Sequence, residues 1–222
     1  MRWCNVRVAT MAMLSVAFFL LAPIGASWAS QDTNLIDSNP RSLIEDRHRV
    51  FLGLLNEPIG NSPEQTREKL RDVLSSFVDF EEIGRRSLNR HIENLTPKQR
   101  KRYTKAFKRL IQLTYLRRLK LGNHYEMTVT EAPEVRGEKA KAKTLLRTDS
   151  IEVEVDYLLM RNSSGLWRSY DIIIDGVSMV RNYRKALDKL MREKGFDVMV
   201  NRIEEKVLEK EKLLAEERGG TK

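Results

Sequence analysis

Cysteine is almost absent: Cys4 is the one cysteine among 222 residues. It lies in an N-terminal segment that we expect to be removed, so the mature protein would carry no thiol. Disulfide bonds, thiolate metal sites and cysteine nucleophiles are therefore excluded. A mature domain of about 190 residues without disulfides must be held by its own hydrophobic core, and this length is sufficient for one.

Motifs of catalysis are also missing. The three histidines, His48, His91 and His124, lie far apart and show no metal-ligand spacing. No glycine-rich phosphate loop and no G-x-S-x-G elbow occurs. Asp171 and Asp175 could form a carboxylate pair, but an aspartate directly before a glycine is typical of a turn. The sequence therefore favours a binding protein, without metal or cofactor, over an enzyme.

The N-terminus predicts export. Arg2 and Arg7 precede an apolar run over residues 11–22, and small residues stand at Ser27 and Ala29. We expect residues 1–29 to be a secretory signal peptide, cleaved after Ala29. A transmembrane anchor is the alternative, but the run is short for a bilayer, which needs roughly 20 apolar residues. The expected location is the periplasm.

Positive charge exceeds negative charge. The chain has 40 lysines and arginines against 31 aspartates and glutamates, and removal of the two arginines of the signal leaves 38 against 31. Such a surplus attracts anionic surfaces. After export, phospholipid headgroups or an acidic protein are the expected partners, and nucleic acid is not.

The domain plan has four parts. After the signal peptide, residues 30–40 are polar and are expected to be flexible. Residues 41–203 form the folded domain. Residues 204–222 are dominated by charge and are expected to form a solvated helical tail.

A strongly basic helix is expected over residues 97–121, where ten lysines and arginines occur and no acid. Thr96 and Gln99 form a capping-box pattern at its start. Its basic side is either a solvated face or a docking surface for a partner or a membrane. The candidate docking residues are Lys98, Arg102, Lys105, Arg109, Arg117 and Arg118.

The second half of the chain changes to the period of strands. Four alternating segments predict an antiparallel meander, and helices before and after it make the fold class α+β. A hairpin turning at Thr148 and Asp149 would place Ala142 opposite Val155 and Thr144 opposite Val153 on the inner face. These small residues leave room, which either a helix side chain or a ligand must fill.

The stretch from Leu166 to Asp197 joins sheet to helix. A strand runs to a turn at Asp175 and Gly176, and an amphipathic helix follows at once. Gly195 stands where a helix is expected to end. This helix should fold back over the sheet and enclose an apolar space.

Three segments resemble the MlaC family of periplasmic phospholipid-binding shuttles, also called toluene-tolerance auxiliary proteins. They are FVDFEEIGRRSLNRH at residues 77–91, LTPKQRKRYTKAFKRLIQLTY at residues 95–115, and WRSYDIIIDGVSMVRNYR at residues 167–184. The last, with its D-G-V-S turn, is the most specific. The resemblance covers roughly residues 43–203.

The resemblance implies a pocket between a twisted sheet and helices that holds phospholipid acyl chains. It also implies two partners, an inner-membrane ABC lipid transporter complex and an outer-membrane lipoprotein complex, and a role in outer-membrane lipid asymmetry. The residues expected to contact the acyl chains, for which ordinary core packing is the competing interpretation, are Phe107, Ile111, Tyr115, Ala142, Val153, Val155, Trp167, Ile172, Ile174, Val177, Val180 and Tyr183.

Departures from the family pattern leave other functions open. Asn89 and Ile92 stand where the family has glycine and tryptophan, and Tyr103 replaces a phenylalanine. The lipid could therefore be a hopanoid or another isoprenoid. The two remaining alternatives are an enzyme that uses a buried carboxylate such as Asp171, and a non-lipid adaptor that docks through the basic helix.

Overall fold

The structure is a computed structural model that describes residues 37–56, 62–117, 119, 121 and 123–219. The predicted signal peptide and residues 30–36 lie outside these ranges. The helices are α2 (Pro40–Asn56), α3 (Pro63–Phe77), α4 (Phe80–Leu88), the short 3-10 helix η1 (Asn89–Ile92), α5 (Pro97–Leu116) and α6 (Met179–Gly219). The strands are β1 (Tyr125–Val129), β2 (Glu134–Arg136), β3 (Lys139–Thr148), β4 (Glu152–Arg161), β5 (Trp167–Ile174) and β6 (Val177–Ser178).

Helix starts follow the capping chemistry in the sequence. The hydroxyl oxygens of Ser62 and Thr96 each accept a hydrogen bond from the backbone N–H three residues later, at 3.3 Å in both cases. The side chains of Gln65 and Gln99 accept hydrogen bonds in return from the backbone N–H of the cap residue. Each box satisfies N–H groups that a helix leaves unpaired at its start. Helix α5 therefore begins where expected, and α3 begins by the same chemistry.

The sheet is an antiparallel meander with strand order β1-β3-β4-β5-β6. The short strand β2 also pairs with β3. The predicted four strands and the α+β class are confirmed, with β2 and β6 as two short additions. Side chains of β3 alternate between buried and more exposed positions, as one covered face requires. Lys141 on the more exposed face pairs with Asp156 at 2.7 Å.

The predicted register of the β3–β4 hairpin is wrong by two residues. Thr144 lies opposite Val155 and Ala142 lies opposite Tyr157. The reason is the turn, which is centred on Asp149 and Ser150 because the Thr148 hydroxyl oxygen accepts from the backbone N–H of Ser150 and of Ile151. Since the side-chain period of a strand is two, the same residues still face inward.

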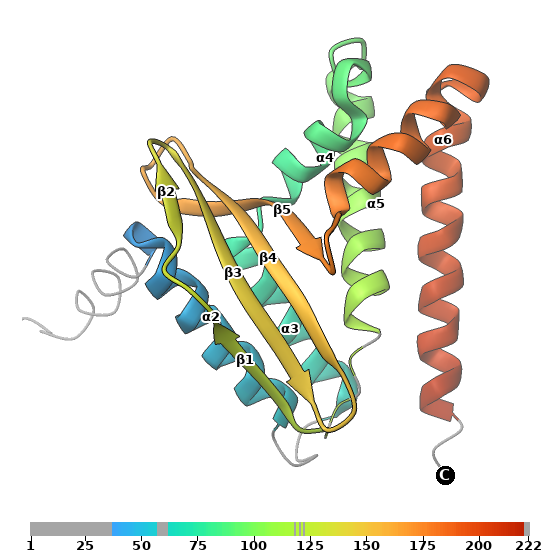
Figure 1. Ribbon diagram of the computed structural model, residues 1–222. Coiled ribbons are helices and arrows are strands. Elements are labelled where there is room, and N and C mark those ends of the chain that lie inside the picture. The colour runs from blue at the N-terminus through green and yellow to red at the C-terminus, as the bar shows by residue number, and fades with distance from the viewer. Residues whose placement is uncertain (1–36, 57–61, 118, 120, 122, 220–222) are drawn as a thin grey trace, which may run out of the picture.

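Helices cover one face of the sheet (Figure 1). In that view α2 and α3 lie behind the long strands β3 and β4, α5 stands beside α3, and the second half of α6 runs alongside α5 on the outside. Asn56 at the end of α2 exchanges two hydrogen bonds with the backbone of Tyr125 in β1. The backbone N–H of Asp79, which follows α3, donates to Ser169 in β5 at 2.8 Å. These bonds fix the helical layer against the sheet.

The connection from sheet to α6 differs in detail from the sequence expectation. Asp175 and Gly176 both have positive φ, as a tight hairpin turn requires, but the chain then forms β6 before the helix begins at Met179. Gly195, with φ 75° and ψ −179°, interrupts the helix and separates its two halves. The prediction that a helix ends at Gly195 is therefore confirmed.

The hydrophobic core is divided into two clusters of buried residues. The larger one joins the helices to the middle of the sheet and includes Phe77, Phe107 and Tyr157. The smaller one contains Leu55, Leu70, Leu116 and Tyr125. Leu74 and Leu146 are half-buried and pack against both clusters, so the smaller cluster adjoins the larger one.

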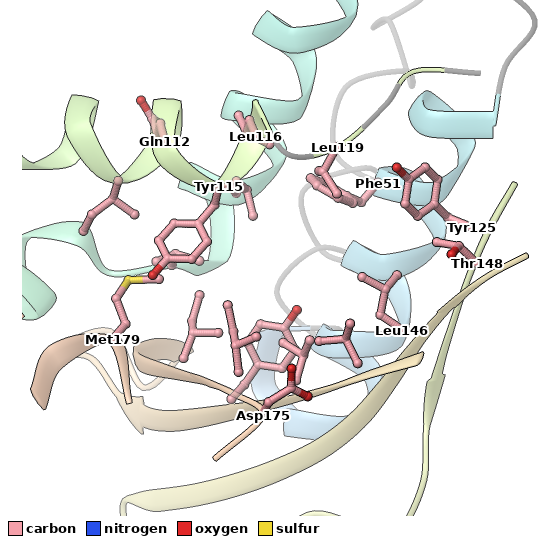
Figure 2. Close-up of a pocket in the computed structure, with 18 of the residues that line it drawn as sticks. Phe51, Gln112, Tyr115, Leu116, Leu119, Tyr125, Leu146, Thr148, Asp175 and Met179 are labelled. Carbon is pink, nitrogen blue, oxygen red and sulfur yellow. The ribbon is translucent and has the colours of Figure 1, made fainter. Parts of the chain in front are cut away.

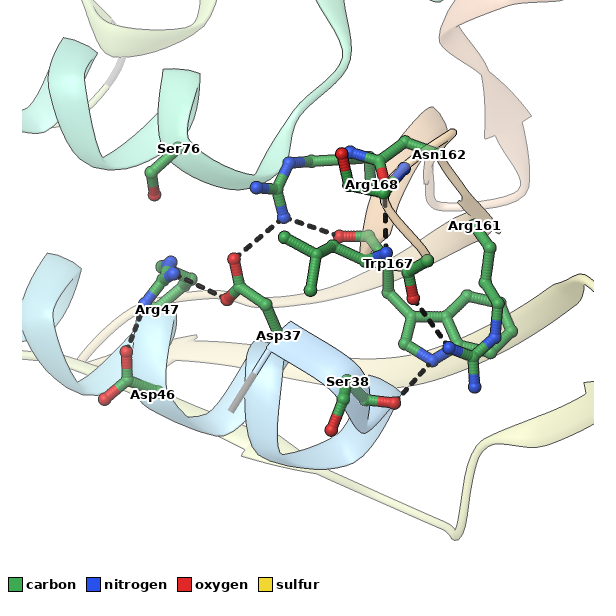
Figure 3. A network of polar contacts seen from close by, with 12 residues as sticks. Asp37, Ser38, Asp46, Arg47, Ser76, Arg161, Asn162, Trp167 and Arg168 are labelled. Atoms are coloured by element: carbon green, nitrogen blue, oxygen red, sulfur yellow. Dashed lines mark hydrogen bonds and ion pairs between the residues drawn. The ribbon is translucent and has the colours of Figure 1, made fainter. Parts of the chain in front are cut away.

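Residues just before α2 are anchored (Figure 3). The buried carboxylate of Asp37 accepts from Arg47 at 2.7 Å and from Arg168 at 2.9 Å. The indole N–H of Trp167 donates to the carbonyl of Ser38 at 2.9 Å. The expected flexibility of residues 30–40 therefore does not extend to residues 37–40, because these contacts tie them to β5.

A buried histidine links α2 to the sheet. His48 Nε2 lies 3.2 Å from the hydroxyl oxygen of Tyr157 in β4. Burial lowers the pKa of His48 to about 4, because the charged imidazolium would lose its hydration. Burial also raises the pKa of Tyr157 above its ordinary value. Both side chains are therefore neutral at physiological pH.

Replacing Asp37 should destabilise the protein strongly. Asp37→Asn leaves the partly buried Arg168 without its counter-charge and removes one of the two carboxylates that pair with Arg47, so we expect the free energy of unfolding to fall by about 3 kcal/mol. Glu45→Gln breaks the exposed pair with Arg41 and should cost less than about 1 kcal/mol. Urea unfolding of both variants measures the difference. Equal losses would contradict the structural role of Asp37.

Acid should weaken the fold through His48. The unfolded chain takes up the proton near pH 6.5 and the folded chain only near pH 4, so the unfolded state binds more protons in this window and stability falls as the pH falls. The loss should reach about 3 kcal/mol at the acid end. In His48→Gln this part of the pH dependence should vanish, whereas His124→Gln, at an exposed position, should retain it. Urea unfolding midpoints of the wild type and both variants, measured from pH 7 to pH 4, test this prediction.

Candidate functional site: an apolar cavity between sheet and helices

A cavity of about 480 Å³ lies between the inner face of the sheet and helices α2, α3 and α5 (Figure 2). This volume is within the range of small-molecule pockets. The walls are mainly aliphatic and aromatic. The lining residues are Phe51, Leu74, Val78, Phe80, Ile111, Gln112, Tyr115, Leu116, Leu119, Asn123, Tyr125, Leu146, Thr148, Ser150, Ile151, Val153, Val155, Tyr157, Ile172, Ile174, Asp175 and Met179.

The cavity borders both core clusters. Val78, Ile111 and Tyr157 of its wall belong to or line the larger cluster, and Leu116 and Tyr125 belong to the smaller one. Leu74 and Leu146 also line the cavity and pack against both clusters, so the cavity lies beside the place where the clusters meet. An apolar void in a close-packed interior forfeits dispersion contacts, and an apolar ligand would restore them.

Polar side chains gather where the cavity opens. Asn123, Ser150 and Asp175 are lining residues that remain exposed, and they come from loops at the ends of strands. Ile151 in the same region is 58% exposed, which is unusual for a large aliphatic side chain. An apolar interior with a polar rim suits an amphipathic ligand whose hydrocarbon part enters and whose polar part stays at the surface.

Two polar groups in the wall are already satisfied. The Tyr157 hydroxyl lies against His48, as described above. The buried side chain of Gln112 donates to the hydroxyl of Ser75 at 3.2 Å. The wall therefore does not require a polar ligand group at these positions.

Six of the twelve residues expected to contact acyl chains line the cavity. They come from α5 and from the inner faces of β4 and β5. They are Ile111, Tyr115, Val153, Val155, Ile172 and Ile174.

The other six are not among the residues that line this cavity. That any of the twelve contacts an acyl chain stays a prediction. Phe107 stacks on Tyr103 and meets Tyr183 edge to face, so both pack among the helices. Val180 is buried at the start of α6. Val177 is 60% exposed. It belongs to β6, because the chain continues from the turn as a short strand and not as a helix.

The last two of these six residues, Ala142 and Trp167, are buried in β3 and β5. Arg161 lies over the Trp167 ring, 4.7 Å from its centroid, and the indole is tied to Ser38. The small side chain of Ala142 faces the helices without opening a cavity of its own in the wall described here. Its register partner is Tyr157, which itself lines the cavity.

Sequence reasoning missed wall residues from α2, α3 and α4. Phe51, Leu74 and Phe80 line the cavity and were not among the expected contact residues. Helical periodicity identifies which side chains face the sheet and cannot tell which of them face a void. The one indication of these wall residues in the sequence was that several helices were needed to cover the inner face of a four-stranded sheet.

The six candidate docking residues lie in different settings on α5 and just after it. Arg102 and Arg109 form ion pairs with Glu204 and Glu211 of α6, at 2.6 and 2.7 Å. Lys98 and Lys105 are exposed, and Arg117 is half-buried just after the helix, which ends at Leu116 and not near residue 121. Arg118 lies outside the described residues.

The carboxylate of Asp171 is fully engaged in the fold. It accepts hydrogen bonds from the backbone N–H groups of Ile172 and Val180 at 2.9 and 3.0 Å, and from the hydroxyl of Ser178 at 2.5 Å. It therefore stabilises the start of α6, and it does not line the cavity. Among the described residues, no group of three or more histidines, aspartates and glutamates could hold a metal ion.

No helix within the described part of the chain is long and apolar enough to cross a membrane. Comparison with solved structures shows the fold. A phospholipid-binding protein from Ralstonia solanacearum, in complex with a phospholipid, matches with a TM-score of 0.69 and 18% identity, over 78% of this chain and 98% of the other.

Two relatives are similar in sequence. One is the intermembrane phospholipid transport system binding protein MlaC of Haemophilus influenzae, 22% identical over 152 residues, 66% of this chain and 71% of the relative. The other is the toluene tolerance protein ttg2D of Pseudomonas putida, 22% identical over 163 residues, 72% of this chain and 76% of the relative. The family model described as MlaC protein matches residues 52–205, more than half of the sequence. The chain therefore belongs to the MlaC family.

Proposed function

We propose that this protein is a periplasmic phospholipid carrier that holds lipid acyl chains in the cavity between the sheet and α2, α3 and α5. The observation that carries the proposal is the cavity itself, which borders both parts of the hydrophobic core and has apolar walls and a polar rim. Family membership supports it, and so does the structural neighbour, which is described as bound to a phospholipid.

Burial of hydrocarbon supplies the affinity in this proposal. Each methylene group moved from water into an apolar wall contributes about 0.8 kcal/mol. About ten such groups give roughly 8 kcal/mol, which corresponds to micromolar affinity before any headgroup contact. The headgroup would lie at the rim beside Asn123, Ser150 and Asp175. Few specific polar contacts are then needed, so several headgroups should be accepted.

Transport, and not catalysis, fits the arrangement best. The buried carboxylate of Asp171 is occupied by three hydrogen-bond donors and is not directed at the cavity. A carrier also needs partners at both membranes. We propose an inner-membrane ABC lipid transporter complex and an outer-membrane lipoprotein complex, reached after export directed by the signal peptide of residues 1–29.

Organic extraction of the protein tests the proposal. The protein is purified from the periplasm of its own cells without detergent, extracted, and analysed by mass spectrometry. We expect phospholipid at a near-stoichiometric level. Extraction of a hopanoid would keep the carrier and change its cargo, and an empty protein would overturn the proposal in favour of an adaptor.

A bulky residue in the wall should displace lipid. Val153→Trp places a large ring in the cavity, whereas Val135→Trp introduces the same ring at a position of β2 that is 53% exposed and outside the wall. We expect several-fold less co-purified phospholipid in the first variant and no change in the second. Circular dichroism confirms that both fold. Equal occupancy in the two variants would mean that the acyl chains bind elsewhere.

A further inference from the structure

The first half of α6, residues 179–194, carries a surplus of positive charge. It contains six lysines and arginines and two acidic residues. Its apolar side chains fix the orientation of the helix, because Val180 and Leu187 are buried in the larger core cluster. The opposite side of the helix therefore faces solvent, and most of the basic residues lie there in exposed positions.

Three of these basic residues form a row. Arg181, Lys185 and Lys189 are exposed and stand four residues apart. Residues at this spacing follow one side of a helix at intervals of about 6 Å. The ion pairs that residues 179–194 form within the described ranges all involve Asp188, so the three side chains of the row have no acidic partner there.

The two acidic residues of this helix half do not neutralise the row. The carboxylate of Asp188 lies 2.8 Å from His91 Nε2, and it pairs with Arg192 and Arg90 at 3.0 and 3.7 Å. The hydrogen bond from His91 is the main reason that the pKa of Asp188 is lowered. Its charge is thus already engaged by three other residues. Glu193, the second acid, forms no ion pair with a described residue and is exposed.

Helix stability does not explain the row. Arg181 lies in the first turn of α6, where the positive end of the helix dipole disfavours a cation. Like charges four residues apart also weaken a helix. Arg192 and Lys194, in contrast, stand just before the break at Gly195, where the dipole favours cations. The first part of the row therefore opposes the stability of its own helix, which suits residues that serve in binding.

The basic side of α5, which the sequence suggested as a docking surface, is partly covered by the chain itself. Arg102 donates two hydrogen bonds to Glu204, at 2.9 and 2.6 Å, and Arg109 donates to Glu211 at 2.7 Å. Leu214 of the same segment is buried. The tail beyond residue 204, which we expected to be solvated, therefore contacts α5. The row on the first half of α6 has no such acidic segment against it.

The row begins beside the cavity. Met179, the first residue of α6, lines the cavity, and Arg181 follows two residues later. The exposed residues Glu154 and Asp175 lie next to each other at the turn before α6, joined by hydrogen bonds of 3.0 and 3.1 Å. An anionic bilayer would attract the row and repel these carboxylates, whereas a protein can present the opposite charge to each. The charge pattern therefore favours a protein partner.

We propose that Arg181, Lys185 and Lys189 form a docking surface for a protein partner that presents a row of carboxylates one helical turn apart. A partner bound there lies beside the wall of the cavity at Met179, where a carrier could receive or release its lipid. Only this use in lipid transfer rests on the proposed function. The binding itself does not depend on lipid in the cavity.

The test uses the purified protein and a fluorescein-labelled, alanine-based helical peptide with glutamate at every fourth position. Wild-type protein should bind this peptide in fluorescence anisotropy, and salt should weaken the binding. Arg181→Gln, Lys185→Gln and Lys189→Gln combined should weaken it about tenfold, since each exposed charge pair contributes little. The control, Lys98→Gln, Lys101→Gln and Lys105→Gln combined, makes the same charge change at exposed positions of α5 and should bind like wild type.

Circular dichroism confirms that both variants fold, and an unchanged content of co-purified lipid in the α6 variant keeps this test separate from that of the proposed function. No peptide binding by wild type, or an equal loss in the two variants, would overturn the proposal. Vesicles of equal parts phosphatidylcholine and phosphatidylglycerol form the second arm. If the α6 variant loses affinity for these vesicles but not for the peptide, the row binds a membrane and the proposal is wrong.

Discussion

An apolar cavity can persist between a sheet and its helices only if the two walls are held apart at their ends. In this protein, the Asp37–Arg168 pair and the Trp167–Ser38 hydrogen bond join the helical side to β5 at one end. The cluster around Leu55 and Tyr125 joins α2 to β1 at the other. Between them about 480 Å³ stays free of side chains. The cost of this unfilled space is a loss of packing that a hydrocarbon chain would recover.

Asp171 and Gly195 determine the course of the C-terminal half. Asp171 accepts from both the strand and the first turn of α6, so the helix leaves the sheet in a fixed direction. Gly195 then permits a sharp change of direction that other residues would resist, because its φ is positive. The second half of α6 returns along α5, which already forms one wall of the cavity.

Local chemistry in the sequence predicted much of this fold, and the void was harder to locate. The capping boxes at Ser62 and Thr96, the Asp175 turn and the break at Gly195 each depend on residues close in sequence. The β3–β4 register depended on whether the turn was centred on residues 148–149 or on residues 149–150. Because side chains of a strand alternate with a period of two, a register shift of two residues leaves the same hydrophobic pattern. Six predicted cavity residues proved to be packed or exposed elsewhere, as Val177 illustrates, because periodicity gives the inward face and says nothing of what stands opposite.

The most direct measurement of the central claim is photo-crosslinking with a phospholipid that carries a photoreactive group at the end of one acyl chain. After digestion, mass spectrometry locates the crosslinked residues. The account predicts crosslinks on both walls of the cavity, at Ile111 of α5 and at Val155 and Ile172 of the sheet. Crosslinks confined to the outer surface of α5 and α6 would contradict it.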